Sequence, residues 1–308
     1  MISKQFAKGL MFGCIAAFFY GLNPLFTLPL YQLGLTPDAV LFYRFGVASI
    51  LLAIIMYQQK ISFKLNKKEF LTLLLVGIIF AFSSLTLFIS YQLIEAGIAS
   101  TILFIYPLLV AVIMVLFFHE RLNLLTMLAI TLVILGVSLL YQNDNGTNLN
   151  PFGVLLVFIS ALTYAIYIIA VERSPLHNIP VLKLTFYGLF FGSLVFFIRL
   201  DFGTALPIDF SPTLLVNVLG LSVFTTIFSL VLMNHSIQMI GPTTASIIGA
   251  LEPITALLVG VVIFNEQMTA RIFLGIVLIL SAIILTVSGK EILHFLFGGR
   301  HHHFRFRH

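Results

Sequence analysis

The sequences STILFIYPLLVAVIMVLFFHE at residues 100–120 and SIIGALEPITALLVGVVIFNE at residues 246–266 decide the fold, because they are two copies of one pattern. The two copies align at a single offset, which pairs Ser100 with Ser246, Pro107 with Pro253, and Glu120 with Glu266. Earlier in the chain, a similar offset pairs Tyr20 with Tyr164, Tyr43 with Tyr187, and Ser49 with Ser193. The chain is therefore built from two related halves.

The composition indicates that lipid, not water, surrounds most of this chain. Of 308 residues, 60% are hydrophobic and only 9% are Asp, Glu, Lys or Arg, whereas soluble domains carry about 25% charged residues. The mean hydropathy is +1.12. These values exclude a soluble enzyme, a nucleic-acid binder and a disordered protein. Its single cysteine excludes an intrachain disulfide.

Polar and Pro/Gly breaks divide the chain into ten apolar stretches, each near the roughly 20 residues that a membrane-spanning helix needs. They are continuous, unlike the alternating strands of a membrane barrel. We predict an all-α polytopic membrane protein whose first repeat is residues 1–145, whose second is 146–290, and whose tail is 291–308. The predicted spans are 9–31, 38–57, 70–92, 97–117, 122–141, 152–171, 181–200, 212–234, 243–264 and 269–288.

The distribution of basic residues predicts the orientation, because cytoplasmic loops are enriched in Lys and Arg. With both termini in the cytoplasm, Arg199 and Arg271 fall at outer loops, Arg44 falls within a span, and the segment 141–151, which has no Lys or Arg, lies outside. The remaining basic residues then lie inside: Lys4, Lys8, Lys60, Lys64, Lys67, Lys68, Arg121, Arg173, Lys183, Lys290, Arg300, Arg305 and Arg307.

Each predicted repeat holds five helices, so the second copy enters the membrane from the opposite side. Inverted-topology repeats are a device of secondary transporters, in which two pseudo-symmetric halves open alternately to the two sides. The sequence therefore predicts a ten-helix, 5+5 inverted-repeat transporter.

Four segments resemble the EamA-type transporters of the drug/metabolite transporter superfamily. They are GLNPLF at 21–26, FYRFGVAS at 42–49, YPLLVAVIMVLFFHERL at 106–122 and EPITALLVGVVIFNEQMTARIFLGIVLILSAIIL at 252–285. The resemblance implies a cavity between the first four helices of each half, with helices five and ten at the periphery. It implies export or exchange of small metabolites, often amino acids, across a bacterial inner membrane. The paired basic residues of the sugar-phosphate branch are missing, which disfavours an organophosphate.

Glu252 is the first candidate site residue, because an ionisable group inside a span costs about 2.5–3.5 kcal/mol on insertion scales. It lies near the middle of its span and precedes Pro253, which disturbs the helix. Its counterpart in the first repeat is Tyr106. Two interpretations stay open: a site for a substrate amine or a proton, or a structural carboxylate.

Arg44 and Asn23 are expected near the outer gate. Arg44 either holds a substrate carboxylate or pairs structurally with a polar group such as Asn23. Other polar side chains in the cavity helices either line the path or serve helix–helix hydrogen bonds. These are Tyr20, Tyr164, Tyr167, Tyr187, Ser83, Ser84, Thr225, Thr226 and Asn234.

The resulting functional prediction is a secondary transporter of a small molecule in the lipid bilayer, driven by protons or by a counter-substrate. We expect no nucleic-acid partner, a monomer or homodimer, and no cofactor or metal, since His301, His302 and His303 are adjacent and have no fixed ligand geometry. Motifs of hydrolases and nucleotide-binding enzymes are missing. The alternatives are a multidrug or nucleotide-related exporter of the same superfamily, and a polytopic membrane enzyme or sensor scaffold.

Overall fold

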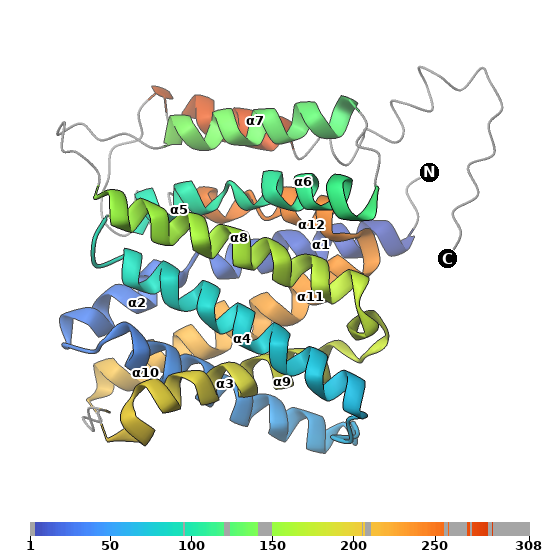
Figure 1. The fold of residues 1–308 in the computed structure, drawn as a ribbon. Helices are drawn as coiled ribbons and strands as arrows, with labels where there is room; N and C mark the ends of the chain where they lie inside the picture. The colour runs from blue at the N-terminus through green and yellow to red at the C-terminus, as the bar shows by residue number, and fades with distance from the viewer. Residues whose placement is uncertain are drawn as a thin grey trace.

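The computed structural model describes residues 4–94, 96–119, 124–140, 150–204, 206, 211–255, 258, 270–271, 273–282 and 285. Within these ranges the chain is helical and contains no strand (Figure 1). The predicted outer segment at 141–149, the tail 291–308 and the paired residues Glu120 and Glu266 lie outside the described residues.

The helices follow one another in the order that the hydropathy predicts, with several divided into two pieces. They are α1 (Lys4–Tyr20), α2 (Asn23–Gln32), α3 (Pro37–Gln58), α4 (Lys67–Ser90), α5 (Ala96–Leu103), α6 (Tyr106–Phe118), α7 (Leu124–Leu140), α8 (Pro151–Arg173), α9 (Val181–Arg199), α10 (Pro212–Ser222), α11 (Ser229–Ile240) and α12 (Pro242–Ile248). Short 3-10 helices at Pro175–Asn178 and Asp201–Gly203 and a π-helix at Val223–Phe228 complete the set.

Six of the described helices are long and apolar enough to cross a membrane. They are Lys4–Gln32, Pro37–Gln58, Lys67–Ser90, Pro151–Arg173, Val181–Arg199 and Pro212–Ile240, and shorter apolar helices lie at Tyr106–Phe118, Leu124–Gly136 and Phe273–Ala282. The prediction of an all-helical, multi-span membrane protein is confirmed. The count of ten helices in a 5+5 arrangement stays a prediction.

Helix starts follow from local capping chemistry. Asn66 and Glu69 form a reciprocal capping box at the start of α4, with bonds of 2.7 Å and 3.1 Å. The Asn150 side chain accepts from two backbone N–H groups at the start of α8, and the Ser211 hydroxyl accepts from one at the start of α10. These polar caps fix where the apolar runs begin.

Prolines divide three of the spans that the sequence predicts as continuous, namely 9–31, 97–117 and 243–264. Proline lacks an N–H and its ring clashes with the carbonyl four residues earlier, which breaks a helix there. Accordingly, α1 ends at Tyr20 and α5 at Leu103, each four residues before a proline, and α12 ends at Ile248, five residues before one. The three prolines are Pro24, Pro107 and Pro253.

The span predicted at 212–234 is also irregular in its middle, where α10 passes through the π-helix Val223–Phe228 into α11. The hydroxyl of Thr226 donates to the carbonyl of Leu221, five residues earlier, at 2.8 Å. Single-turn π-helical segments within α-helices occur frequently at functional sites.

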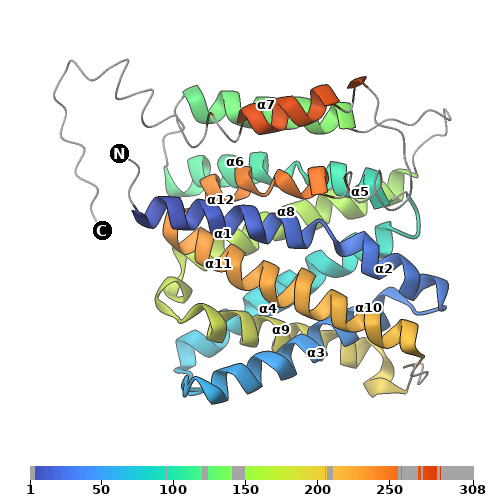
Figure 2. The same cartoon turned by 180° about the vertical axis from the view of Figure 1, so that it is seen from behind.

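The helices pack in pairs, α1 against α11, α4 against both α8 and α9, and α3 against α9 (Figures 1 and 2). Both ends of the α3–α9 pair carry polar contacts. At one end Arg199 Nε donates to Asp38 Oδ1 at 2.5 Å, and at the other Lys183 Nζ donates to the carbonyl of Lys64 at 2.5 Å. Helix α9 is thus tied at one end to α3 and at the other to the connection between α3 and α4.

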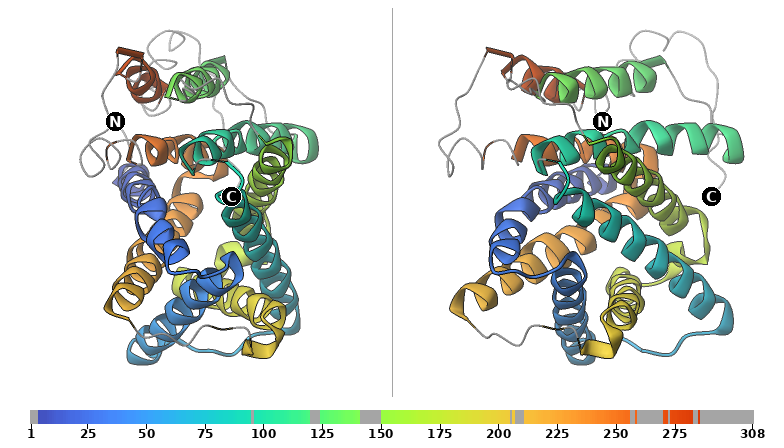
Figure 3. Two further views of the ribbon diagram at one scale, coloured as in Figure 1. Left: turned by 90° about the vertical axis from the view of Figure 1, so that its left-hand side faces the viewer. Right: turned by 60° about the vertical axis from the view of Figure 1, so that its left-hand side comes forward.

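Helix α7 and the helix Phe273–Ala282 lie side by side in a layer at the edge opposite to α3 and α9, as all the views show (Figure 3). They approach closely at Gly136, where an added Cβ would lie 2.8 Å from the carbonyl oxygen of Gly275. This is the peripheral position that the resemblance implies for the fifth helix of each half. The candidate site lies at the breaks between α1 and α2, between α5 and α6, and after α12, beside the end of α4.

Candidate functional site

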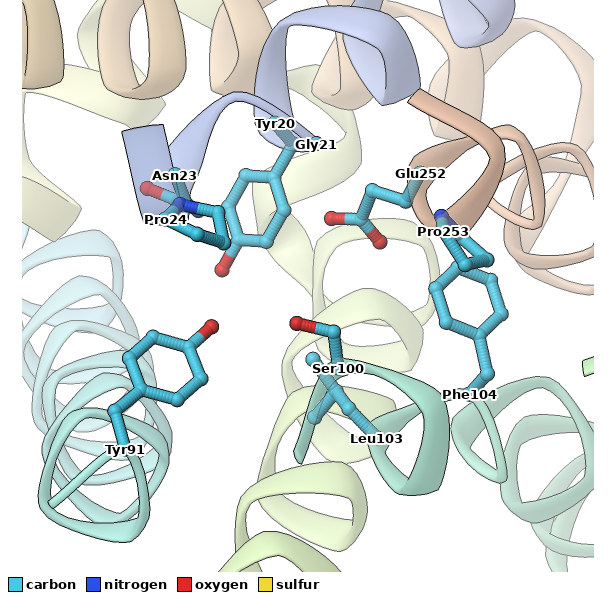
Figure 4. Close-up of a pocket in the computed structure, with 10 residues that line it drawn as sticks. All are labelled: Tyr20, Gly21, Asn23, Pro24, Tyr91, Ser100, Leu103, Phe104, Glu252 and Pro253. Atoms are coloured by element: carbon cyan, nitrogen blue, oxygen red, sulfur yellow. The ribbon is translucent and has the colours of Figure 1, made fainter. Parts of the chain in front are cut away.

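The three proline breaks meet at one pocket, drawn in Figure 4. The pocket is small in this conformation. The first break supplies Tyr20, Gly21, Asn23 and Pro24, the second supplies Leu103 and Phe104, the third supplies Glu252 and Pro253, and Tyr91 and Ser100 complete the lining.

The polar groups of the pocket converge on one space. In Figure 4 the carboxylate of Glu252 and the hydroxyls of Tyr20, Tyr91 and Ser100 point into this space from four different segments, while the ring of Phe104 and the side chain of Leu103 form apolar wall. An apolar pocket with a few convergent polar groups is typical of a small-molecule binding site.

Glu252 is buried, with 7% of its surface exposed. Its backbone N–H donates to the carbonyl of Gly249 at 2.9 Å, but its side chain makes no hydrogen bond to any residue that the structure describes. A buried charged group is costly unless it is paired. The carboxylate of Glu252 is therefore available to a ligand in the pocket.

Arg44 is fully buried in α3, and it is not among the residues that line the pocket. Its Nε donates to the hydroxyl of Thr226 at 2.6 Å and its Nη2 to the carbonyl of Thr225 at 3.5 Å, both in the π-helix. Its guanidinium lies over the rings of Tyr20, Phe45 and Phe88 at 5.6, 5.8 and 5.4 Å. The structural partner is thus Thr226 and not Asn23. Nη1 of Arg44 is buried and has no hydrogen-bond partner among the described residues, so both interpretations of Arg44 stay open.

An aromatic stack extends from the pocket into the protein. The ring of Tyr20 stacks on Tyr164 at 6.4 Å, and Tyr164 stacks on Tyr167 at 6.0 Å. Tyr106 meets Tyr164 edge-on at 5.0 Å, and Phe80 packs on Tyr167 at 4.8 Å. Three residues that the sequence analysis predicted for the site thus lie behind the residues that line the pocket. They are Tyr106, Tyr164 and Tyr167.

Further predicted residues hold helices together. The hydroxyl of Tyr167 donates to Asn234 Oδ1 at 2.9 Å, and Asn234 Nδ2 donates to Thr185 Oγ1 at 3.1 Å, which links α8, α11 and α9. Tyr106 donates to the carbonyl of Ser246 at 3.3 Å. The predicted residues Tyr167, Asn234 and Tyr106 therefore hold neighbouring helices together.

The last three predicted residues lie apart from the pocket lining. Ser83 bonds to Ser160 of α8, at 3.0 Å to the carbonyl. Ser84 is buried and its hydroxyl has no partner among the described residues. The hydroxyl of Tyr187 donates to the carbonyl of Phe63, in the connection between α3 and α4, at 2.6 Å. Glu252, Asn23 and Tyr20 are the predicted residues that line the pocket.

Sequence reasoning missed Tyr91 and Ser100. Tyr91 directly follows α4, and Ser100 sits in the short helix α5. Polar residues near the ends of apolar runs are common in membrane proteins, so neither position carried a distinguishing signal. Only the packing of α4 and α5 against the three breaks brings them to Glu252.

The arrangement can bind a small ligand through one carboxylate, several hydroxyls and aromatic walls. Within the described ranges, no group of three or more His, Cys, Asp or Glu side chains is placed to hold a metal ion. The site has the parts for recognition, and Glu252 is the one acidic or basic group that lines it.

The fold is shared with a known crystal structure. That structure superposes with a TM-score of 0.79, covering 93% of this chain and 99% of the other at 14% identity, which establishes similarity of fold.

The sequence is similar to those of several proteins that are named as uncharacterized transporters. An uncharacterized transporter of Archaeoglobus fulgidus is 26% identical over 83% of this chain and 90% of its own. The uncharacterized inner membrane transporter YicL of Salmonella typhimurium is 27% identical over 71% of this chain and 74% of its own. The uncharacterized transporter YcbK of Bacillus subtilis is 23% identical over 94% of each chain.

The family comparison agrees with the internal repeat. The sequence model of the EamA-like transporter family matches this chain twice, over residues 7–142 and over residues 151–288. Together the two matches cover most of the chain, one in each half. The chain therefore belongs to the EamA-like transporter family.

Proposed function

We propose that this protein is a secondary transporter that moves small amine-bearing metabolites, a class that includes amino acids, across a bacterial inner membrane by alternating access. The observation that carries the proposal is the carboxylate of Glu252. It is buried, has no hydrogen-bond partner among the described residues, and lines a pocket at three helix breaks. Broken helices form the substrate sites of many secondary transporters, and an ionisable group inside the membrane is a functional candidate by default.

In this proposal Glu252 pairs with the amine of the substrate, and the hydroxyls of Tyr20, Tyr91 and Ser100 orient it. An ammonium and a carboxylate form a charge-assisted hydrogen bond, which is stronger than a neutral one. The aromatic stack behind Tyr20 closes the path beyond the pocket.

Alternating access requires that the two ends of the molecule open in turn. We assign this to α9, which Arg199 ties to Asp38 of α3 at one end and Lys183 ties to the Lys64 carbonyl, in the connection between α3 and α4, at the other. Release of one tie while the other holds would expose the pocket to one side. In the orientation expected from the basic residues, both termini are cytoplasmic and the Lys183 tie lies inside.

Export in this scheme draws on protons or on exchange with a counter-substrate. Glu252 is suited to either, because it can carry a proton or a substrate amine but not both at once. The transporter works as a monomer or a homodimer, since the pocket forms within one chain.

The test is the substitution Glu252→Gln, which keeps the shape of the side chain and removes its charge. We expect the variant to fold but to lose gradient-driven transport by about tenfold or more, which corresponds to about 1.4 kcal/mol per decade, no more than one charge-assisted hydrogen bond. Transport of a panel of amino acids and amines is measured in proteoliposomes, from mildly acidic to mildly alkaline pH.

The matched control is Glu172→Gln, the same change at a carboxylate that pairs with His177 outside the pocket, at 2.9 Å. It should transport like the unmodified protein. Equal rates and equal pH profiles for Glu252→Gln and the unmodified protein would reduce Glu252 to a structural residue and remove the centre of the proposed site.

A further inference from the structure

A patch of lysines lies where the chain passes from α3 to α4. The sequence KISFKLNKK at 60–68 contains Lys60, Lys64, Lys67 and Lys68, and all four side chains are exposed. Helices α3 and α4 are both long and apolar enough to cross a membrane, so the segment that joins them lies at a membrane surface, at one corner of the molecule (Figure 1). The four lysines, here called the lysine patch, therefore lie at the level of the lipid headgroups.

The lysine patch has no counter-charge within the described part of the chain. None of its four ammonium groups forms an ion pair or a side-chain hydrogen bond with a described residue. The adjacent acid, Glu69, is bonded to the backbone N–H of Asn66 at 3.1 Å. Other basic side chains are engaged by the protein, since Lys183 donates to a backbone carbonyl and Arg173 lies over an aromatic ring. The positive charge of the patch is thus available to an outside partner.

Helix stability does not account for these lysines. Lys67 and Lys68 lie in the first turn of α4, where the helix dipole disfavours positive charge. The start of α4 is already capped, because Asn66 Oδ1 accepts from the N–H of Glu69 at 2.7 Å. The positions of the two lysines are unfavourable for the helix itself and favourable for contact with an anion at the membrane surface.

The backbone that carries the patch is held in place by the rest of the protein. The Ser62 hydroxyl accepts from the N–H of Lys64 at 3.2 Å, which closes a local turn. Helix α9 contacts the same segment twice. Lys183 Nζ donates to the carbonyl of Lys64 at 2.5 Å, and the Tyr187 hydroxyl donates to the carbonyl of Phe63 at 2.6 Å. The patch is therefore part of a built structure that includes the end of α9.

Exposed aromatic side chains flank the lysines. Tyr57, Phe63 and Phe70 are 80%, 39% and 47% exposed. Amphipathic rings such as that of Tyr57 are enriched at the membrane–water interface, and the alkyl stem of a lysine can lie along apolar surface while its ammonium group stays in the headgroup layer. The combination of rings and ammonium groups suits the boundary between acyl chains and phosphates.

We propose that the lysine patch binds the phosphate of an anionic phospholipid and thereby holds the α3–α4 connection against the bilayer. Four or more basic residues directly beside a membrane span are a signature of acidic-lipid binding. Lys64 links the lipid to α9, because its side chain belongs to the patch while its carbonyl accepts the Lys183 bond. The inference needs the segment to lie at a membrane surface, and it is independent of the transported substrate and of which side is cytoplasmic.

The test is a lipid titration of the full chain in a neutral detergent, followed by native mass spectrometry that counts bound lipids. Phosphatidylglycerol and phosphatidylcholine with the same acyl chains are the two probes. We expect half-occupancy at about tenfold lower concentration for phosphatidylglycerol, and a higher unfolding temperature with this lipid only. Replacement of all four lysines by glutamine should abolish both effects, whereas replacement of all four by arginine should retain them.

A matched pair of double variants assigns the effect to the patch, and it also serves if the quadruple glutamine variant does not fold. Lys64→Gln with Lys67→Gln should weaken the preference for phosphatidylglycerol, while Lys4→Gln with Lys8→Gln, which removes the same charge at the exposed start of α1, should retain it. An equal loss in both pairs, or no preference in the unmodified protein, would overturn the inference. Glycerol 3-phosphate that displaces the lipid at equal concentration would overturn the lipid as occupant and indicate a soluble phosphate instead.

Discussion

At the residue scale, the buried charged side chains of Glu252 and Arg44 have different surroundings. The Glu252 side chain has no hydrogen bond to any described residue and faces a pocket, while Arg44 is bonded to Thr226 and enclosed by three aromatic rings. Sequence reasoning treated both as candidates for ligand binding, because an ionisable residue in a span is costly in either role. The protein supplies hydrogen-bond partners for Nε and Nη2 of Arg44, but among the described residues it supplies none for Arg44 Nη1 or for the Glu252 carboxylate.

The bond between Arg44 and Thr226 should therefore matter for stability. Thr226→Val removes the acceptor of the Arg44 Nε and the i to i−5 bond of the π-helix. Since a hydrogen bond to a charged group contributes about 1.5–3 kcal/mol, we expect a loss of that order in the free energy of unfolding in detergent. Thr226→Ser keeps the hydroxyl and should retain most of the stability.

The control is Thr72→Val, the same change at an exposed threonine of α4 that bonds only to the Lys68 carbonyl of its own helix. It should have little effect. If Thr226→Val unfolds at the same denaturant concentration as Thr226→Ser, the Arg44 bond does not stabilise the π-helix.

At the element scale, three proline-broken helices create the pocket. Prolines within a span are visible in sequence, and the disturbance at Pro253 was predicted from the sequence. The sequence did not show that the breaks at Pro24 and Pro107 face the one at Pro253. The breaks meet because their backbones approach closely. At Gly21 this approach is possible because glycine has no side chain.

Gly21 is where the first and third breaks touch. A Cβ there would lie 2.6 Å from the carbonyl oxygen of Glu252 and 2.7 Å from Thr255 Cβ. Overpacking of this kind typically costs about 1–3 kcal/mol. We expect Gly21→Ala to lower thermal stability in detergent and to reduce transport, because it pushes Glu252 out of place.

Gly46→Ala is the matched control, since an added Cβ at Gly46 has no neighbouring atom within 4 Å. It should match the unmodified protein in both measurements. Unchanged stability and transport in Gly21→Ala would show that the first and third breaks are further apart than the structure indicates.

At the scale of the whole molecule, the two matched halves at 7–142 and 151–288 and the distribution of basic residues fix how the chain is expected to cross the membrane. An odd number of helices in each half requires the two halves to be inverted. The positive-inside rule predicts an orientation with both termini in the cytoplasm, and labelling can test it.

For that test, the single native cysteine, Cys14, is first replaced by alanine. A cysteine at Asn145 should then react with an impermeant thiol reagent added to intact cells, and one at Gln59 should react only after the cells are opened. Gln59 is exposed just after α3, and it is a better inner position than Asn66, which caps α4. The reverse pattern would contradict the orientation and the placement of the Lys183 tie on the inner side.

The sequence by itself determined that lipid surrounds most of the chain, that the chain forms several apolar helices, and that it consists of two related halves. Hydropathy and the positions of prolines are properties of single helices, and the repeat is visible as a pattern of residues that recurs along the chain. It also singled out Glu252, Asn23 and Tyr20, because polar and ionisable side chains inside a span are candidates for a site, and these three line the pocket.

Only the tertiary structure decided which polar groups meet. Arg44 finds its partner 182 residues away at Thr226, and the Tyr187 hydroxyl reaches Phe63 from 124 residues away. Likewise, Tyr91 and Ser100 join Glu252 in the pocket from distant helices. Hydrogen bonds across helices depend on how those helices rotate and cross, and close packing of whole faces sets that geometry. No local sequence signal contains it.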